Sequence, residues 1–464
     1  MRKAIVVAIV ASLSGCAVGP DYEQPKIAVD TQFVNAAGFS ESDVQADFWT
    51  LFNEPVLDEL VQAALLANKD LEQARANLAA SRAARRIVGF DSYPTVTARA
   101  SRLHILQSQN QQPLLTRDQR EFDDSDAGFD AAWELDLFGR VRRGREAARA
   151  DEQAAAAEVH NVQVTVTAEV ARNYFVLRGL QEQLDVATRN ATNQQQTLEL
   201  TQVRLDAGRG TELDRSRAEA QLKTTLASIP PLRASIATTS YRLSVLTGRL
   251  PNALSSTLIG SQPLPALPEI NAISSPDALL RRRPDIRSAE RNLAGATARV
   301  GIAVGDLFPR VTFIGSIGYN SAKVDDLVKS QTDTYSYGPS ISWAAFDLGR
   351  VRARIDVAKA QTQAALAAYE SAVLTALEET EGALVSYGYA RSRRATLEEA
   401  AAASSKAADL ARQRFEGGLA DFLNVLDAER DALSLQDSLA QSRTQTATSL
   451  VAVYKALGGG WVQR

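Results

Sequence analysis

The stretch Trp133-Glu-Leu-Asp-Leu-Phe-Gly-Arg-Val-Arg returns 210 residues later as Trp343-Ala-Ala-Phe-Asp-Leu-Gly-Arg-Val-Arg. The same offset relates Arg204-Leu-Asp-Ala-Gly to Arg414-Phe-Glu-Gly-Gly, and the register holds without a gap for over a hundred residues. Upstream the offset becomes 215, where Tyr93-Pro matches Phe308-Pro. The chain is therefore predicted to be a duplicated unit whose halves fold alike, with a variable exposed loop where the offset changes.

Each half is predicted to contain, in order, a helix, a strand, a loop, a strand, a very long helix, a turn and a helix. The first helix is expected over about 55–88, from apolar residues at helical spacing. After each Gly-Arg-Val-Arg motif, roughly 65 residues rich in Ala, Gln, Glu and Arg predict a helix on the order of 100 Å long. Pro230-Pro231 is expected to break or kink the last helix of the first half.

Four segments of about ten residues alternate apolar and polar side chains, as a tilted transmembrane strand does. The clearest are 129–137 and 335–343, and weaker ones begin near Val96 and Val311. Trp133 and Trp343 stand at equivalent strand ends and fit an aromatic girdle at a membrane interface. A soluble antiparallel sheet with one buried face would show the same alternation, but it would not need helices of this length.

Open strand edges are unstable in lipid, and four strands are too few to close a barrel. Several copies of the chain must therefore share one barrel. Two, three or four copies would give eight, twelve or sixteen strands, and the pattern of residues does not choose among these numbers.

The N-terminus resembles a bacterial lipoprotein signal. Arg2 and Lys3 precede an apolar stretch over 4–12, and Leu-Ser-Gly-Cys16 follows at once. We therefore expect cleavage before Cys16 and acylation of its thiol. Ala17 differs from the aspartate that retains many enteric lipoproteins in the inner membrane, so delivery to the outer membrane of a Gram-negative bacterium is expected. An ordinary secretory signal beside a chance cysteine is the alternative.

Composition argues against several classes of function. The net charge of −4 gives no reason to expect nucleic acid as a partner. His104 and His160 are the only histidines in the chain and Cys16 its only cysteine, so no metal site, cofactor or catalytic residue is predicted, and the chain is not expected to be an enzyme. A lipid-anchored periplasmic adaptor is a second alternative, but it would have a single helical hairpin between soluble β domains.

These features predict a division of the chain into six parts. Within the two repeats, the β-hairpins are expected over 92–138 and 307–348. The parts are a signal peptide (1–15), an N-terminal anchor and extended segment (16–54), the first repeat (55–248), a Pro/Ser-rich linker (249–275), the second repeat (276–458) and a C-terminal tail (459–464).

The signal motif, the paired Gly-Arg-Val-Arg and Arg-x-x-x-Gly motifs and the closing Tyr454-Lys-Ala-Leu-Gly-Gly-Gly-Trp resemble the NodT-type lipoprotein branch of the TolC-like outer-membrane efflux factors. The resemblance implies an α+β membrane protein. Three copies would form a twelve-stranded outer-membrane β-barrel continued by a twelve-helix periplasmic α-barrel. The implied partners are a periplasmic adaptor, outer-membrane lipid and an inner-membrane pump of the RND type, with MFS and ABC pumps as alternatives. The implied function is passive efflux through an exit duct.

The resemblance also implies where the duct meets its partners and where it closes. The helix-turn-helix tips that would contact the adaptor map to Gly208-Arg-Gly210 and Gly417-Gly418, although a sharp helical reversal needs glycine anyway. The positions that resemble the pore constriction are Leu423 and Asp427, with Arg430 as a tethering partner. The repeat equivalents of Leu423 and Asp427 are Leu213 and Arg217, so an ion pair between helices could hold the duct shut. An ordinary solvated helix charge is the alternative for Asp427.

Overall fold

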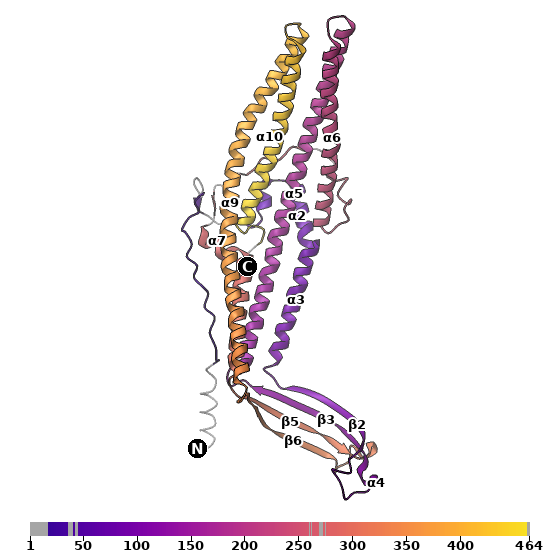
Figure 1. Ribbon diagram of the computed structural model, residues 1–464, viewed down its shortest axis with the longest axis vertical. Helices are drawn as coiled ribbons and strands as arrows, with labels where there is room; N and C mark the ends of the chain where they lie inside the picture. The colour runs from indigo at the N-terminus through magenta and orange to yellow at the C-terminus, as the bar shows by residue number, and fades with distance from the viewer. Residues whose placement is uncertain are drawn as a thin grey trace. The chain divides into compact units, whose positions relative to one another are not determined.

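The computed structural model describes residues 17–35, 40–41, 45–258, 260, 262–268, 272–273 and 275–461 (Figure 1). The predicted signal peptide (1–15) and Cys16 lie outside the described residues. The chain divides into two compact units, which are described separately below. One unit holds 1–26, 77–156 and 288–370, and the other holds 27–76, 157–287 and 371–464.

The first unit is built on a four-stranded antiparallel sheet with the order β2-β3-β5-β6. Its two hairpins have the same register, because the pair Thr95 and Ala132 becomes Arg310 and Ser342 when 215 and 210 are added. The change of offset therefore lies at the far end of the hairpins, as predicted. The loops there contain α4 (Arg117–Arg120) and η2 (Val324–Asp326), and the strands are β2 (Thr95–Leu106), β3 (Glu121–Leu135), β5 (Arg310–Ser321) and β6 (Asp333–Ser342).

The register places most of the large apolar side chains of the sheet on one face. Trp133 pairs with Phe313, and Phe313 pairs with Pro339, so alternate residues of each strand share that face. Its large side chains are exposed in the chain; Ile317 is 64% and Tyr337 74% accessible. The opposite face is mostly polar, although Leu103, Ile105 and Ile314 also lie on it. There Arg99 of β2 bonds to Asp126 and Asp130 of β3.

The helices repeat in pairs along the chain. The first repeat has α2 (Pro55–Ala67), α3 (Lys69–Phe90), α5 (Arg140–Asp206) and α6 (Glu212–Leu246), and the second has α7 (Pro276–Arg282), α8 (Pro284–Gly305), α9 (Leu348–Glu416) and α10 (Phe422–Ala456). With 67 and 69 residues, α5 and α9 are each about 100 Å long at the usual rise per residue. This agrees with the length expected from the sequence.

The first helix is not continuous as predicted, and the break considered at Pro230-Pro231 does not occur. The helix predicted over about 55–88 is interrupted at Asn68, whose backbone is extended, and the second repeat is interrupted at the equivalent Arg283. Conversely, Pro230 and Pro231 lie inside the continuous helix α6. Each proline removes a bond to the carbonyl four residues earlier. Because Leu226 is exposed at this point, water can hydrate the freed carbonyl groups.

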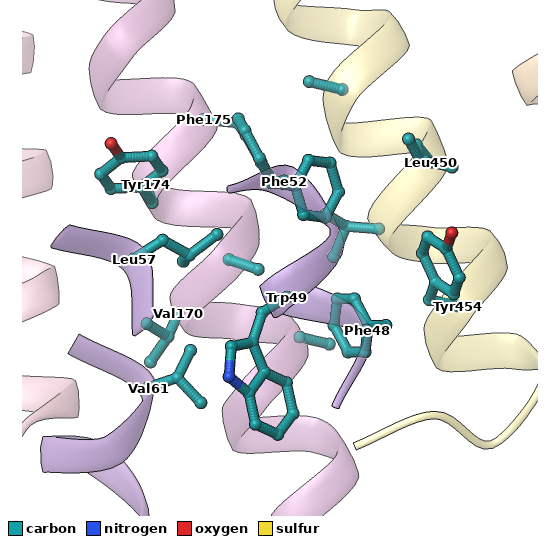
Figure 2. Close-up of a cluster of buried hydrophobic side chains, with 14 of the residues drawn as sticks. Phe48, Trp49, Phe52, Leu57, Val61, Val170, Tyr174, Phe175, Leu450 and Tyr454 are labelled. Carbon is teal, nitrogen blue, oxygen red and sulfur yellow. The ribbon is translucent and has the colours of Figure 1, made fainter. Parts of the chain in front are cut away.

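The second unit has an apolar core where α5 and α10 meet η1 (Phe48–Phe52) and α2 (Figure 2). Phe48 stacks on Tyr454 with 5.1 Å between the ring centroids, and Phe52 packs against Phe175 at 4.7 Å. The hydroxyl of the fully buried Tyr174 donates to Glu54 at 2.5 Å, and burial followed by this bond raises the pKa of Tyr174 to about 12. The predicted C-terminal tail joins this unit, since Trp461 is buried and stacks on His160.

The segment predicted as a linker is packed against α5. Leu254 and Leu258 are buried, and the Leu258 carbonyl accepts a bond from Gln181 at 2.6 Å. Further along, β4 (Ala272–Ile273) pairs in parallel with β1 (Ser40–Glu41). These contacts attach the connection between the repeats to the second unit.

The two helix interruptions carry equivalent buried polar contacts. Asn68 donates to the Leu246 carbonyl at 2.9 Å, and Arg283 donates to the Ala456 carbonyl at 3.1 Å. The positions correspond in the repeat, since 68 plus 215 is 283 and 246 plus 210 is 456. Each break therefore places one buried side chain against the last turn of the returning helix.

Candidate functional site

Both turns between the long helices end in the same backbone motif. At the first tip the Gly208 amide donates to the Leu205 carbonyl at 2.9 Å, and the Arg209 amide donates to the Arg204 carbonyl at 2.8 Å. This bond pattern is a Schellman motif, which requires a left-handed residue. Gly208 has φ +68°, and Gly418, with the same bonds at the second tip, has φ +71°.

The other two tip glycines differ from these. Gly210 and Gly417 are outside the left-handed region, so the turn does not require glycine there on conformational grounds. A side chain at Gly210 would still lie 3.0 Å from the Leu205 amide nitrogen. The turn conformation therefore requires glycine most strongly at Gly208 and Gly418. The predicted contact of the tips with an adaptor stays a prediction.

A small apolar cluster near the tips joins the two repeats, and composition and local pattern gave no indication of it. Phe415 and Phe422 flank the second turn, with ring centroids 5.7 Å apart, and they pack with Ala218 of α6. The guanidinium of Arg204 lies 4.1 Å from the centroid of Phe415 and donates to the carbonyls of Phe415 and Glu416. The first tip is therefore attached to the second through the end of α5.

Glu429 of α10 forms a second connection between the helices below the tips. This carboxylate is buried, accepts a bond from Thr197 of α5 at 2.9 Å, and pairs with Arg412 of α9 at 2.8 Å. A second polar contact joins the same three helices. Gln436 of α10 bonds to Asn190 of α5 and to Ser405 of α9, each at 2.9 Å. These groups come from three helices, so the sequence pattern of any one helix could not reveal them.

The predicted constriction residues all have free side chains in the single chain. Leu423 is 47% and Leu213 56% accessible, and Asp427 shares the face of Leu423 one helical turn further on. Asp427, Arg217 and Arg430 are exposed, and none of them has an ion pair or hydrogen bond within the part of the chain that the structure describes. The Arg217–Asp427 pair considered above does not form within one chain. It remains a prediction for contacts between chains.

The two strand-end tryptophans make equivalent hydrogen bonds. The indole Nε1 of Trp133 donates to the Ser92 carbonyl at 3.1 Å, and that of Trp343 donates to the Leu307 carbonyl at 3.0 Å. Both carbonyls belong to the connection between a helix and its first strand. Each ring is thereby held where the helical part of the unit meets the sheet.

A charged cluster lies at the other end of the apolar face, and the alternation of residues gave no indication of it. His104 bonds to Asp123 at 2.8 Å and to Glu121 at 3.0 Å, on the same face as Trp133. Asp123 is ten residues from Trp133 along β3, roughly 33 Å of strand. With a tilt of about 40°, the height between them is about 25 Å, the thickness of the apolar band on outer-membrane barrels.

None of the described helices combines the length and apolar character needed to cross a membrane. The described residues also contain no group of His, Cys, Asp and Glu side chains placed to hold a metal ion. His160 of α5 bonds to Gln163 at 2.9 Å and stacks on Trp461.

Comparison with known proteins identifies the family of the chain. The chain matches the family described as outer membrane efflux protein at residues 60–249 and 275–459, one match for each repeat. It is 31% identical to the solvent efflux pump outer membrane protein SrpC of Pseudomonas putida, over 97% of this chain and 96% of the relative. It is 30% identical to nodulation protein T of Rhizobium leguminosarum bv. trifolii, over 97% and 95%.

Solved structures agree over nearly the whole length. The outer-membrane channel OprN superposes with a TM-score of 0.90 at 43% identity, over 96% of this chain and all of that chain. The open state of the MtrE outer membrane channel of Neisseria gonorrhoeae gives 0.84 at 30% identity, over 96% and 98%. The chain therefore belongs to the outer membrane efflux protein family, has the TolC-like fold, and is a non-enzymatic outer-membrane channel of a Gram-negative efflux system.

Proposed function

We propose that three copies of the chain form one passive exit duct. The observation that carries this proposal is the pair of open sheet edges. Strands β2 and β6 each have a single neighbour within the chain, although the sheet carries an apolar face suited to lipid. Their free backbone groups need partners in a bilayer, and β6 of one copy pairing with β2 of the next supplies them. The resemblance to TolC-like channels supports three copies.

We further propose that the duct is anchored by an acyl chain on Cys16. Support comes from the residues directly after it. The Val18 amide donates to the Phe138 carbonyl at 3.1 Å, and Gly139, with φ +80°, approaches Ala17 so closely that a Cβ at Gly139 would lie 2.6 Å from it. The chain after Cys16 is thus fixed at the start of α5, beside the end of β3, where lipid is near.

The periplasmic end is proposed to close through rings of Leu423 and Asp427. Threefold symmetry turns each free side chain near the tips into a ring of three. Three carboxylates close together repel one another, so the closed state needs cations such as Arg217 or Arg430 from a neighbouring copy. Docking of an adaptor opens the ring if its contacts with the open arrangement are stronger than those with the closed one.

The duct is proposed to work with a periplasmic adaptor and an inner-membrane pump of the RND type. Relatives carry names with different cargoes, among them solvent, toluene and pyoverdine. One fold serving such different molecules favours selection by the pump and a duct that conducts what the pump delivers.

Crosslinking at a tip tests the proposal. A photoreactive side chain at Leu419, which is 73% exposed, should capture a periplasmic adaptor in intact cells. The same group at Leu250, equally exposed but at the far end of α6, should capture none. Mass spectrometry of the adduct identifies the partner. Finding no adaptor at Leu419, or the same adduct at both positions, would contradict the proposed assembly.

A further inference from the structure

A wide, strongly basic cavity lies between α3 and α5 in the first unit. Its volume is about 960 Å³. Six arginines and two glutamates contribute to its wall, a formal charge of +4. The lining residues used below are Arg82, Arg85, Arg86, Phe90, Tyr93, Arg142, Arg145, Glu146, Arg149 and Glu152.

The glutamates neutralise only part of this charge. Glu152 pairs with Arg85 at 2.5 Å and with Arg82 at 3.4 Å, and the bond to Arg85 is the main reason why the pKa of Glu152 is lowered. Arg86 and Arg149 have no ion pair or hydrogen bond within the described ranges of the chain. Two guanidinium groups with all their donors available therefore face the cavity.

The internal repeat indicates that the fold does not need four of the six arginines, whereas Arg142 and Arg149 have the basic equivalents Arg352 and Lys359. The equivalent of Arg86 is Gly301, and that of Arg145 is Ile355. Arg82 and Arg85 correspond to Thr297 and Val300. The second repeat forms the same pair of helices with small or apolar side chains at these four positions, so the charge of these four arginines is particular to this cavity.

The cavity opens on the face of α5 that carries the N-terminal segment. Glu146 lines the cavity and pairs with Arg143 at 2.8 Å. The same guanidinium bonds to Asp21 at 2.7 Å and to the Val18 and Gly19 carbonyls. If the cysteine before that segment is acylated as proposed, this face is the outer face of the duct wall.

The cavity also adjoins the membrane-spanning sheet. Phe90 is the last residue of α3, and Tyr93 lies two residues before β2 begins. Both rings line the cavity, and they are 70% and 66% exposed. Aromatic side chains in this position are typical of the boundary between headgroups and acyl chains. A free phosphate ion would fill only a small part of such a cavity and would gain nothing from the two rings.

We propose that this cavity binds the headgroup of an anionic phospholipid from the inner leaflet of the outer membrane. Arg86 and Arg149 would hold the phosphodiester, since guanidinium groups match phosphate oxygens in a two-point contact. Phe90 and Tyr93 would lie against the glycerol and the start of the acyl chains. The ligand class is therefore a phospholipid with net negative charge.

Lipid binding to the full-length, acylated protein in detergent tests the proposal. Phosphatidylglycerol and phosphatidylethanolamine are titrated separately and counted by native mass spectrometry. We expect one tightly held phosphatidylglycerol per chain and no equivalent retention of phosphatidylethanolamine. Replacing Arg86→Gln and Arg149→Gln together should weaken phosphatidylglycerol binding roughly 30-fold. Arg86→Lys with Arg149→Lys keeps both charges but not the two-point contact, so it should restore only part of the binding.

The repeat supplies a matched control. Arg352→Gln with Lys359→Gln removes two exposed charges at the equivalents of Arg142 and Arg149 and should leave lipid binding unchanged. Circular dichroism of every variant checks that it is folded. The proposal is overturned if both lipids bind equally, if the control weakens binding as much as the test variant, or if millimolar inorganic phosphate displaces the lipid.

Discussion

Replacing Asp427 and Arg217 together by alanine should raise the open-to-closed ratio of the duct about ten-fold in planar bilayers. An exposed ion pair contributes about 0.5 kcal/mol, and threefold symmetry multiplies each contact by three. The sum, about 1.5 kcal/mol, corresponds to that ten-fold change. The structure supports an effect between chains, because neither residue has an ionic partner within the described part of its own chain.

A charge exchange separates an ion pair from a simple loss of charge. Asp427→Arg alone should open the duct, and adding Arg217→Asp should close it again. Asp409→Ala, which removes an exposed carboxylate from α9, should leave the conductance unchanged. If the exchange fails to restore closure while Asp427→Ala opens the duct, Asp427 has another partner. An unchanged conductance in all variants would show that Asp427 is not part of the gate.

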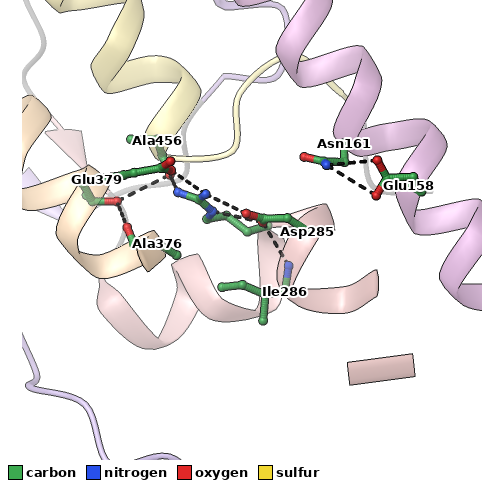
Figure 3. A network of polar contacts seen from close by, with 9 residues as sticks. Glu158, Asn161, Asp285, Ile286, Ala376, Glu379 and Ala456 are labelled. Atoms are coloured by element: carbon green, nitrogen blue, oxygen red, sulfur yellow. Dashed lines mark hydrogen bonds and ion pairs between the residues drawn. The ribbon is translucent and has the colours of Figure 1, made fainter. Parts of the chain in front are cut away.

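Arg283→Ala should lower the stability of the folded chain by about 2–3 kcal/mol. Arg283 is buried at the interruption between α7 and α8 and bonds to Asp285 and to Glu379, the latter at 2.7 Å, and Asp285, Glu379 and Ala456 converge there (Figure 3). Removing one member of a buried ionic network costs several kcal/mol. The effect should be at the low end, because Glu379 is 47% exposed and can be hydrated.

Thermal unfolding of the detergent-solubilised protein measures this effect. Arg281→Ala, two residues earlier in α7, is the control, since its side chain is 76% exposed and its pair with Asp277 is a surface contact. The control should change stability by less than about 0.5 kcal/mol. Equal losses of stability in the two variants would show that the buried network contributes no more than the surface ion pair.

The internal repeat allowed much of this architecture to be predicted from the sequence. The two offsets located the hairpins, the long helices and both turns, because each pattern occurred twice and period-two alternation identifies a strand face directly. The interruption at Arg283 was missed, although Pro284 follows it and the residue before a proline rarely continues a helix. By analogy with the helix expected over about 55–88, the second repeat is also predicted to begin with one helix.

Contacts between distant segments could not be predicted in this way. Glu429 looked like any other charge on a long polar helix, and only the fold brings Thr197 and Arg412 to it. The basic cavity has the same origin. Its arginines come from α3 and α5, which are separated by the whole first hairpin, and only the fold brings the two sets together.

The pairing between neighbouring copies is the central claim, and the repeat predicts its register. Within the chain Trp133 of β3 pairs with Phe313 of β5. The repeat equivalent of Trp133 is Trp343, at the end of β6, and that of Phe313 is Ala98 of β2. If β6 of one copy pairs with β2 of the next as β3 pairs with β5, Trp343 faces Ala98 of the next copy. Ala100 should then face Ile341. Cys16 is the only natural cysteine, and its proposed acylation would leave the protein free of other thiols.

Disulfide formation between Ala100→Cys and Ile341→Cys in one chain tests this claim most directly. After mild oxidation in the membrane, denaturing gels should show dimers and covalently closed trimers and nothing larger. Ala100→Cys with Tyr335→Cys, displaced by six residues or roughly 20 Å along the strand, should give no crosslink. A chain that stays monomeric with the first pair, or a ladder that continues beyond three copies, would contradict the account.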